Sequence, residues 1–478
     1  MAHLRRARYQ PVSRSAEDCS HVYASLAALA LTFSNPAQAV EVAWEGHYRS
    51  RVRYFNSLSL ASVDDNANSE EDSFWTDHRL RLQPGFKISD HASVFMDMDI
   101  LPFVTWGGNP VTMTDPATGE SLESVFAHSV EPPTAEDGSG GTQNIQFRRA
   151  WAQIDTGWGK IRFGRMPIHW GSGMVYNAGN GPLSEYGDTA DRLQISAPVG
   201  PVYLLGAIET SAENLPNVDD DLKTLTASVA YLGEQYGVGT YNTYRWQKFG
   251  DDSQFRLFVG DIWAKADLGT AKFEFETAFA LGGGDLSESV NDVRVTGFGA
   301  QLNAIMGKEK LKAGLTGGVA TGDEDIYDTE YHTFSFDPDF NVALMMFEEP
   351  MPVLAHENSN LASNGGREYG AVRLGDGVSN ALYIKPSIHY SLLEELDVEL
   401  AYIAAKAAKL PVADSENRGY GSEVDLTFSY TPFENVNFTS TTGVFFPGKR
   451  FSTFEHEEFG GGYSSTAVGS RLVGTVEF

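Results

Sequence analysis

The sequence predicts an all-β fold, a transmembrane antiparallel up-and-down β-barrel of about eighteen strands. Three observations predict this fold class. Apolar and polar residues alternate with a period of two from near residue 42 to the end of the chain. Tight turns alternate with longer polar connections, as expected when short periplasmic turns and long extracellular loops join the strands. Hydrophobic residues make up only 42% of the chain, which is too few for a bundle of membrane helices.

The alternation is clearest in the second half of the chain. In the segment 270–281, Phe273 and Phe275 fall on one face, and Glu274 and Glu276 fall on the other. Such segments, with one apolar and one ionisable face, are typical of barrel strands whose apolar face meets lipid. The acids expected to face the lumen in this half are Glu274, Glu276, Asp397, Glu399, Glu423 and Asp425.

Turn signals divide the alternating sequence into strands. The tight turns include Val199-Gly200 and Leu268-Gly269. The two longest connections lie near 105–142 and 322–379. An even number of strands is typical of bacterial single-chain barrels. The expected strands lie near 42–60, 74–88, 91–104, 143–156, 159–168, 188–198, 201–211, 222–233, 235–247, 254–267, 270–282, 294–306, 309–321, 380–392, 395–407, 419–431, 435–447 and 466–478.

The N-terminal residues 1–39 are predicted to be a secretory signal peptide, and residues 40–478 the barrel. Several arginines precede an apolar stretch at 22–33, which is too short to span a membrane as a helix. The sequence Ala-Gln-Ala at 37–39 then offers small residues for cleavage before Val40. We therefore expect export through the Sec pathway and integration into the bacterial outer membrane.

The ends of the mature chain carry further information. The only cysteine, Cys19, lies within the predicted signal, so the mature chain would have no disulfide, thiolate metal site or cysteine nucleophile. At the C-terminus, Phe478 stands in phase with Val476 and Leu472. A terminal aromatic residue in phase with apolar ones is the pattern that we expect barrel-assembly machinery to recognise.

The charge of the chain bears on its partners. A net charge of −29 argues against nucleic acid, which is bound by basic surfaces. The acids concentrate in the long connections, where we expect a solvated face that divalent cations bridge to outer-membrane lipid and lipopolysaccharide.

Arginines concentrate on the inward face of the first strands. An arginine on the lipid face would cost about 2–4 kcal/mol at the membrane midplane, which places these side chains in the lumen. Guanidinium groups can bind carboxylates and phosphates there as solutes. Alternatively they pair with inward acids of the third strand, and the two interpretations are compatible. The pore-lining residues predicted are Arg49, Arg51, Arg53, Arg79, Arg81, Arg162 and Arg192, with Arg148 or Arg149, and the acids Asp97 and Asp99.

A charge count makes anion preference the expected behaviour of such a pore. Five arginines lie on the first two strands, and Asp97 and Asp99 can neutralise at most two of them. The remaining charge acts within a Debye length of roughly 8 Å, whereas the external acids are screened by salt. We expect glutamate at positions 79 and 81 to weaken or reverse the preference.

Two connections have an unusual composition. The glycine-rich segment around Trp170 is expected to form a compact loop folded into the barrel mouth. In the connection 322–379, Asp323, Asp325 and Asp328 are candidate Ca²⁺ ligands, although their spacing lacks the twelve-residue loop pattern. An apolar run follows, and it is expected to pack into the mouth as a constriction because it cannot face water. Its members include Phe336, Val342, Leu344 and Phe347.

Three short motifs resemble the alginate-export porin family and related Gram-negative barrels. They are Phe163-Gly164-Arg165-Met166-Pro167 with Trp170-Gly171, the acidic loop Gly322-Asp323-Glu324-Asp325, and the ending from Phe446-Pro447-Gly448 to Phe478. The resemblance implies an eighteen-stranded barrel whose arginine-rich lumen passes an anionic polysaccharide or a smaller anion.

The sequence therefore predicts a passive outer-membrane channel for anions, with no enzymatic activity and no required cofactor. The alternatives are a general or cation-preferring diffusion porin, a barrel with a plugged lumen, and an outer-membrane enzyme. No nucleophile and base stand at a recognisable spacing to support the last of these.

Overall fold

The structure is a computed structural model that divides into Met1–Glu41 and Val42–Phe478, of which the second unit contains the fold. The signal expected at 1–39 and most of the connection 105–142 lie outside the described residues. The structure describes residues 40–58, 60, 72–105, 112–114, 121–123, 145–212, 221–249, 253–287, 292–325, 328–349, 377–410, 417–452 and 464–478.

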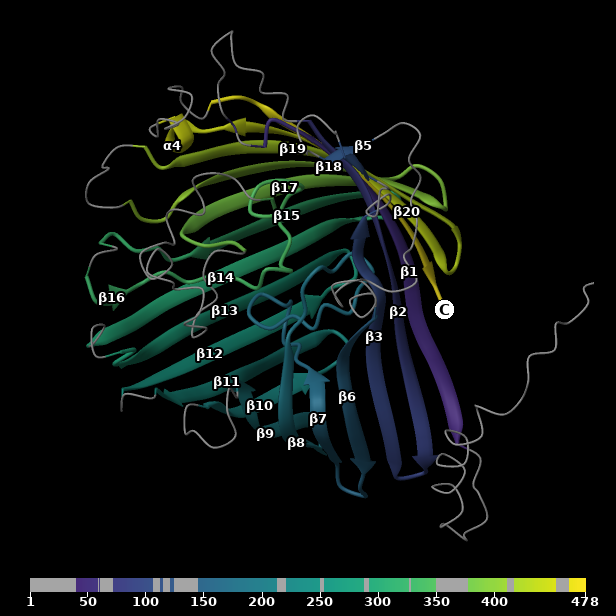
Figure 1. Cartoon of the computed structure of the whole chain (residues 1–478), viewed down its shortest axis with the longest axis vertical. Helices are drawn as coiled ribbons and strands as arrows, with labels where there is room; N and C mark the ends of the chain where they lie inside the picture. The colour runs from purple at the N-terminus through teal and green to yellow at the C-terminus, as the bar shows by residue number, and fades with distance from the viewer. Residues whose placement is uncertain are drawn as a thin grey trace, which may run out of the picture. The chain divides into compact units, whose positions relative to one another are not determined.

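Eighteen antiparallel strands form a closed barrel, as predicted (Figure 1). They are β1 (Glu41–Asn56), β2 (Asp72–Ser89), β3 (Ala92–Thr105), β6 (Ile145–Asp155), β7 (Lys160–Pro167), β8 (Thr189–Val199), β9 (Val202–Ala212), β10 (Leu222–Leu232), β11 (Tyr236–Lys248), β12 (Gln254–Asp267), β13 (Ala271–Gly284), β14 (Val293–Lys308), β15 (Leu311–Ala320), β17 (Ala381–Ser391), β18 (Leu396–Ala407), β19 (Gly419–Phe433), β20 (Val436–Pro447) and β21 (Ala467–Glu477). Each overlaps one predicted strand.

Among the described residues, four short elements were not predicted. β4 (Thr112–Thr114) and β5 (Ser121–Glu123) form a separate two-stranded sheet. β16 (Glu330–Tyr331) pairs in parallel with β14, and α4 (Lys449–Ser452) is a single helical turn. Within the described residues, no helix has the length and apolar character needed to cross a membrane.

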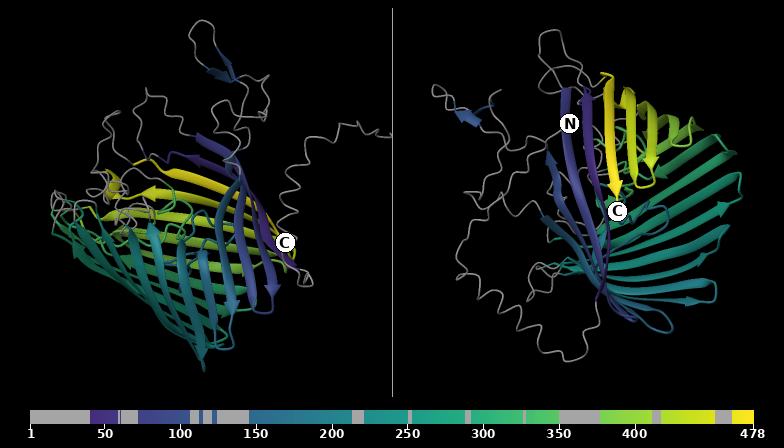
Figure 2. Two further views of the ribbon diagram at one scale, coloured as in Figure 1. Left: turned by 60° about the horizontal axis from the view of Figure 1, so that its bottom comes forward. Right: turned by 90° about the vertical axis from the view of Figure 1, so that its right-hand side faces the viewer.

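The first and last strands close the sheet. β1 pairs with β21 along ten residues, with His47 opposite Glu477. Gly46 and Phe478 exchange backbone hydrogen bonds of 2.9 and 3.0 Å at the end of this seam. Figure 2 shows the first strand beside the last. Since every barrel strand has a neighbour on each side, no edge is left unpaired.

Strand alternation and turn geometry explain the barrel. Outward positions carry exposed apolar side chains such as Leu225, Ile262 and Leu400, whereas the inward positions between them are mostly polar or small. Gly200 and Gly269 have φ values of 60° and 79° in tight turns, a conformation that glycine adopts without a steric penalty.

Described parts of two connections fold back into the barrel and supply its core. They are residues 168–188, here the β7–β8 loop, and residues 321–325, 328–349 and 377–380, here the β15–β17 loop (Figure 1). Side chains of both, including Met174, Phe336 and Leu344, pack in one buried cluster with the inner wall, where Phe55 and Phe445 contribute. The interior of this barrel is therefore partly filled by its own loops.

Candidate functional site

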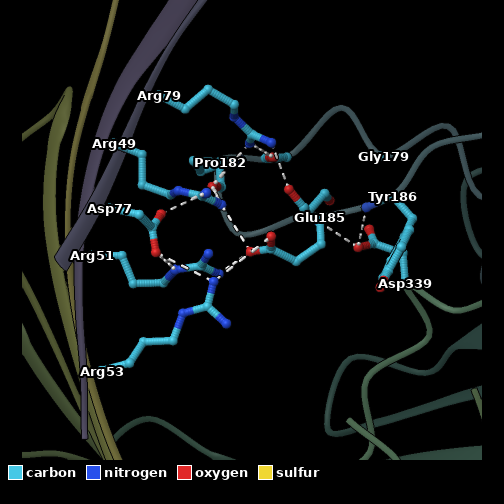
Figure 3. Close-up of polar contacts among 12 residues, drawn as sticks. Arg49, Arg51, Arg53, Asp77, Arg79, Gly179, Pro182, Glu185, Tyr186 and Asp339 are labelled. Carbon is cyan, nitrogen blue, oxygen red and sulfur yellow. Dashed lines mark hydrogen bonds and ion pairs between the residues drawn. The ribbon is translucent and has the colours of Figure 1, made fainter. Parts of the chain in front are cut away.

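Seven arginines from three strands of the segment β1–β2–β3–β6 form one charged side of the lumen. All lie on β1, β2 or β6, and most are at most 2% exposed. Figure 3 shows four of them, Arg49, Arg51, Arg53 and Arg79, facing the β7–β8 loop. This arginine wall consists of Arg49, Arg51, Arg53, Arg79, Arg81, Arg148 and Arg149.

The three arginines of β1 share two carboxylates. Arg49 Nη2 donates to Asp77 Oδ1 at 3.2 Å, and Arg51 Nε donates to Asp77 Oδ2 at 2.9 Å. Arg53 Nη2 reaches the same carboxylate at 3.3 Å. Glu185 of the β7–β8 loop accepts from Arg49 at 3.2 Å and also from Arg51 (Figure 3). One carboxylate of the wall and one of the loop thus neutralise part of this cluster.

Arg79 binds neutral acceptors instead. Its Nη1 donates to the carbonyl of Ser184 at 2.8 Å, and its Nη2 lies 3.2 Å from His47 Nε2. The carbonyls of Gly181 and Pro182 lie 3.4 and 3.3 Å from the same Nη2. Within the described part of the chain, no carboxylate approaches this guanidinium within 4.0 Å. Its positive charge is therefore not neutralised by direct contact.

Arg81 forms a bidentate ion pair. Its Nε and Nη2 donate to the two oxygens of Asp99 at 2.7 and 2.9 Å, and its Nη1 donates to the carbonyl of Gly179 at 2.5 Å. Asp97 lies 3.8 Å from the same guanidinium. Both acids that the sequence placed in the pore therefore pair with the arginine wall.

A β-bulge turns two consecutive arginines inward. Arg149 faces Asp97 across β3 and β6, but the next pair joins Met98 to Phe147, so Arg148 has no opposite residue. Such a bulge lets neighbouring side chains point to the same side of the sheet. Arg149 and Arg148 donate to Asp97 at 3.0 and 3.4 Å. Strict alternation had allowed only one of the two to face the lumen.

The arginine wall holds the β7–β8 loop through its backbone. Arg49, Arg79, Arg81 and Arg149 donate to carbonyl oxygens of loop residues in the range 178–184. Hydrogen bonds from charged donors contribute about 1.5–3 kcal/mol each. These arginines lie inside the barrel but beneath a loop, and Arg53 and Arg148 keep the largest exposed fractions, 17% and 12%.

Two other predicted pore residues lie outside this cluster. Arg162 Nε donates to Gln153 at 2.8 Å. Arg192 donates to the hydroxyl of Tyr241 at 3.1 Å and lies 3.6 Å from Glu209. Both face inward, but neither joins the arginine wall.

The opposite end of the β7–β8 loop binds two inward acids. Trp170 Nε1 donates to Asp261 at 2.9 Å, and the backbone N–H and hydroxyl of Ser172 both donate to Glu276 Oε2 at 2.5 Å. Gly171 lies between them with a φ of 57°, and a Cβ there would come within 2.4 Å of Glu276. This contact therefore requires glycine at position 171.

The tip of the β15–β17 loop binds a second pair of acids. The N–H groups of Leu344 and Met345 donate to Glu423 Oε1 at 3.1 and 2.9 Å, and that of Met346 donates to Oε2 at 2.8 Å. Leu344 N also lies 3.0 Å from Asp425. Inward acids thus bind loop N–H groups, whereas inward arginines bind loop carbonyls.

The two loops also bind each other. Asp339 Oδ1 accepts from the backbone N–H groups of Glu185 and Tyr186 at 2.7 and 3.3 Å (Figure 3). The N–H of Asp337 donates to the carbonyl of Met174 at 2.7 Å. Displacement of one loop would therefore disturb the other.

The residues predicted to form a constriction lie inside the barrel. Phe336, Val342, Leu344 and Phe347 are 0%, 3%, 1% and 8% exposed. The ring of Phe347 lies 6.1 Å from that of Tyr420. This apolar contact and the bonds to Glu423 fix the same segment to the wall.

The candidate calcium residues make backbone contacts. Asp323 accepts from the N–H groups of Asp325 and His332, both at 3.1 Å, and Asp328 accepts from Glu330 N at 2.8 Å. Among the described residues, no three histidine, cysteine or acidic side chains are grouped closely enough to hold a metal ion.

Open space remains beside β13–β21. A pocket of about 400 Å³ lies at the end of the barrel that carries the tight turns, and its lining includes Lys272, Lys312 and Glu399. A second pocket of about 140 Å³ lies nearer the long-loop end, between loop residues 341–344 and the side chains of Lys385 and Arg471. Glu399 and Thr427 line both, so the two pockets adjoin. A further pocket of about 250 Å³ near the β7–β8 loop includes Arg245 and Glu209.

We expect conductance to rise between pH 5 and 8 and then to level off. Burial raises the pKa of the Glu348 carboxyl, in the β15–β17 loop, from 4.5 to about 8, and that of Asp337 from 3.8 to about 7. Release of the loop into water would restore the ordinary pKa values of both carboxyl groups. The packed loop is therefore favoured at low pH and loses stability as pH rises from the ordinary pKa to the raised one.

Conductance measured over pH 5–9 checks this expectation. Glu348→Gln, which keeps an oxygen acceptor for the N–H of Val342, should flatten most of the rise. A wild-type conductance that is constant over this range would contradict the expectation.

Sequence reasoning missed several members of the site. Asp77 stands in phase with Arg79 and Arg81 on β2, so alternation could have identified it as a partner. Glu185 and the backbone carbonyls carry no such signal, because their position depends on how a loop folds back.

Comparison with known proteins agrees with the fold. A family model described as Gram-negative porin matches residues 25–421. Among solved structures, OccK9 (OpdG) of Pseudomonas aeruginosa superposes with a TM-score of 0.51 at 11% identity, covering 91% of this chain and 98% of that one. OccK2 (OpdF) of Pseudomonas aeruginosa, in complex with glucuronate, gives a TM-score of 0.50 at 9% identity, covering 93% and 99%. No curated protein sequence gives a significant match.

The family match covers most of the chain and extends from β1 into the start of β19. The model that matches is not that of the alginate-export porins, so the finer part of the resemblance is not supported. The likeness to the solved barrels is one of fold. The chain belongs to the Gram-negative porin family and is an outer-membrane β-barrel channel.

Proposed function

We propose that this porin is a selective channel that prefers small organic anions. The observation that carries the proposal is the charge balance of the arginine wall. Its seven guanidinium groups have only five carboxylates within 4.0 Å among the described residues, namely Asp77, Asp97, Asp99, Glu185 and Glu349. The unbalanced charge lies in a confined space, where it attracts anions more strongly than it would in bulk water.

The path of the solute follows the open pockets, where further cationic side chains add to the field of the covered arginine wall. Arg471 and Lys385 line the pocket beside the tip of the β15–β17 loop, and Lys272 and Lys312 line the larger pocket below it. Lys385 Nζ donates to the carbonyl of Val342 at 2.9 Å, which places its charge at the loop tip. An anion passing this tip would meet Lys385 and Arg471 at the tip, and Lys272 and Lys312 in the larger pocket below it.

We favour a small anion over an anionic polysaccharide. Both inward loops are bound to the wall and to each other, and the pocket at the loop tip is smaller than the one below it, about 140 against 400 Å³. A polymer would need a continuous passage across this level. Export of a polysaccharide would therefore require release of the β15–β17 loop.

A cation-preferring diffusion porin is the second candidate. Glu399 and Asp425 line the same pocket as Lys385 and Arg471, and the chain carries a net charge of −29. If the acids control the field at the loop tip, potassium would pass more readily than chloride.

The reversal potential of the purified channel under a KCl gradient distinguishes the two candidates. We expect chloride preference in the wild type, and a fall in the chloride-to-potassium permeability ratio of about twofold or more in Lys385→Gln/Arg471→Gln, since local charge sets counter-ion concentration. Lys308→Gln, at the tight-turn end of β14, is the matched control and should leave the ratio unchanged. Glucuronate can replace chloride as an organic probe. Potassium preference in the wild type would refute the proposal.

The proposal retains the expectations for biogenesis. Residues 1–39 would direct Sec export, and Phe478 would present the C-terminal strand to the barrel-assembly machinery. Calcium is not proposed for the acidic loop, because Asp323, Asp325 and Asp328, all described, are not grouped closely enough to hold a metal ion.

A further inference from the structure

A row of charged residues crosses the lipid-facing surface at the end of the barrel that carries the long loops. Lys223 of β10 pairs with Trp246 of β11, which pairs with Arg256 of β12. Arg256 in turn pairs with Gly283 of β13, which pairs with Arg294 of β14. Directly opposed residues of neighbouring antiparallel strands point to the same side of the sheet. These five residues, here the outer cationic row, therefore form one line across five strands.

The row faces outward. The side chains of Lys223 and Arg294 are 39% and 72% exposed, and Arg256 is also exposed. Each lies within the first three residues of its strand, next to a connection of the long-loop end. The cations therefore lie near the outer boundary of the membrane-facing surface.

An apolar row lies directly below it. Leu225 pairs with Tyr244, which pairs with Phe258, and Phe258 pairs with Leu281. On every strand these residues lie two positions from the row, toward the tight-turn end and about 7 Å closer to the periplasm. Leu225, Tyr244 and Leu281 are 52%, 40% and 46% exposed. The surface changes from cationic to apolar within one repeat of the strand, as at a boundary between lipid head groups and acyl chains.

Among the described residues, acids pair with two of the three cations in the row and leave the third without a carboxylate partner. Asp221 lies 3.0 Å from Lys223, and Glu330 lies 3.5 Å from Arg294. Arg256 donates to Gln254 Oε1 at 3.1 Å, and no carboxylate is seen within 4.0 Å of it in the described ranges. An isolated cation at this depth costs little and needs no ligand, but such tolerance does not explain three cations in one register.

The shape of the row suits a phosphorylated sugar. Gly283 leaves no side chain between Arg256 and Arg294, whose strands are about 10 Å apart at two strand spacings. Two guanidinium forks across this gap can each bind phosphate oxygens in bidentate fashion. Trp246, between Lys223 and Arg256, offers an aromatic face with a polar edge, a side chain common at membrane interfaces.

We propose that the outer cationic row binds the phosphorylated sugar head group of an outer-leaflet glycolipid, lipopolysaccharide, whose acyl chains cover the apolar row below. The contact is direct, from guanidinium and ammonium groups to phosphate. It differs from the bridging by divalent cations expected at the acidic loops, and it is independent of the solute that the channel passes.

The experiment measures lipopolysaccharide retained by the full-length mature protein after exchange into fresh detergent containing a chelator. Native mass spectrometry and a phosphate assay count the lipid per barrel, with purified lipopolysaccharide lacking its outer polysaccharide as the probe. We expect Arg256→Gln/Arg294→Gln to lose at least about fivefold in retention, since about 1 kcal/mol corresponds to that factor. Lys308→Gln, an outward cation at the turn end, should retain as much lipid as the wild type.

Further arms separate the alternatives. Dephosphorylated lipopolysaccharide should bind wild type and double variant equally weakly, and single-channel conductance should report that both barrels are folded. Equal retention of the phosphorylated probe by wild type and double variant would overturn the proposal. So would a double variant that keeps its lipid but loses self-association, because the row would then be a subunit interface.

Discussion

Glu423→Ala is expected to raise single-channel conductance by about twofold or more, because a freed loop widens a pore that it had narrowed. The variant removes the acceptor of three successive N–H groups at the tip of the β15–β17 loop, those of Leu344, Met345 and Met346. Asp425 still accepts from Leu344, but the N–H groups of Met345 and Met346 lose their acceptor. Each lost bond contributes about 1.5–3 kcal/mol, so the tip should leave the wall for much of the time. Planar-bilayer recordings measure the change.

Two variants control this result. Glu274→Gln also removes an inward acid, but Glu274 binds Trp263 Nε1 of the neighbouring strand rather than a loop, and conductance should stay near that of the wild type. Deletion of residues 336–350 should raise conductance at least as much as Glu423→Ala. If neither Glu423→Ala nor the deletion changes conductance, the loop tip does not limit the pore.

Arg81→Met should lower the free energy of unfolding by about 3–5 kcal/mol. The substitution keeps the volume roughly similar but leaves the buried carboxylate of Asp99 without its bidentate partner. It also removes a donor to the Gly179 carbonyl, so the β7–β8 loop should become more accessible to protease. Equilibrium unfolding in denaturant, with the barrel in lipid vesicles, measures the loss.

A double-mutant cycle tests the cause. Asp99→Leu combined with Arg81→Met should be more stable than Arg81→Met alone, because the uncompensated charge is gone. Stability losses that simply add in the double variant would show that Arg81 acts through packing rather than through this ion pair.

The strands of the barrel could be predicted because each strand carries its own signal. Alternation in segments such as 270–281 identifies the lipid face, and turns at Gly200 and Gly269 fix the strand ends. Closure of β1 with β21 follows from the even count. Short elements such as β16 carry no alternation, since two residues have no periodicity, and their pairing with β14 depends on a loop that returns from elsewhere.

The site was only partly predictable. The inward direction of Arg49, Arg51 and Arg79 follows from the cost of charge in lipid. Arg148 and Arg149 both face inward because β6 has a bulge opposite Asp97. The position of that bulge is set by the partner strand. Residues 178–184 cover these arginines through backbone carbonyl oxygens. Every residue carries such an oxygen, so the sequence could not predict this contact.

The seam between β1 and β21 has a consequence for how the barrel folds. His47 must find Glu477, near the opposite end of the chain, before the sheet can close. Bringing together the ends of a loop of several hundred residues costs about 5 kcal/mol of chain entropy, and no interaction offsets this cost until pairing starts. Such non-local pairing is intrinsically slow, and until the last strand arrives both edges of the sheet remain open to other chains. Closure of this seam should therefore be the slow step of assembly, and slowest in a chain truncated just before Phe478.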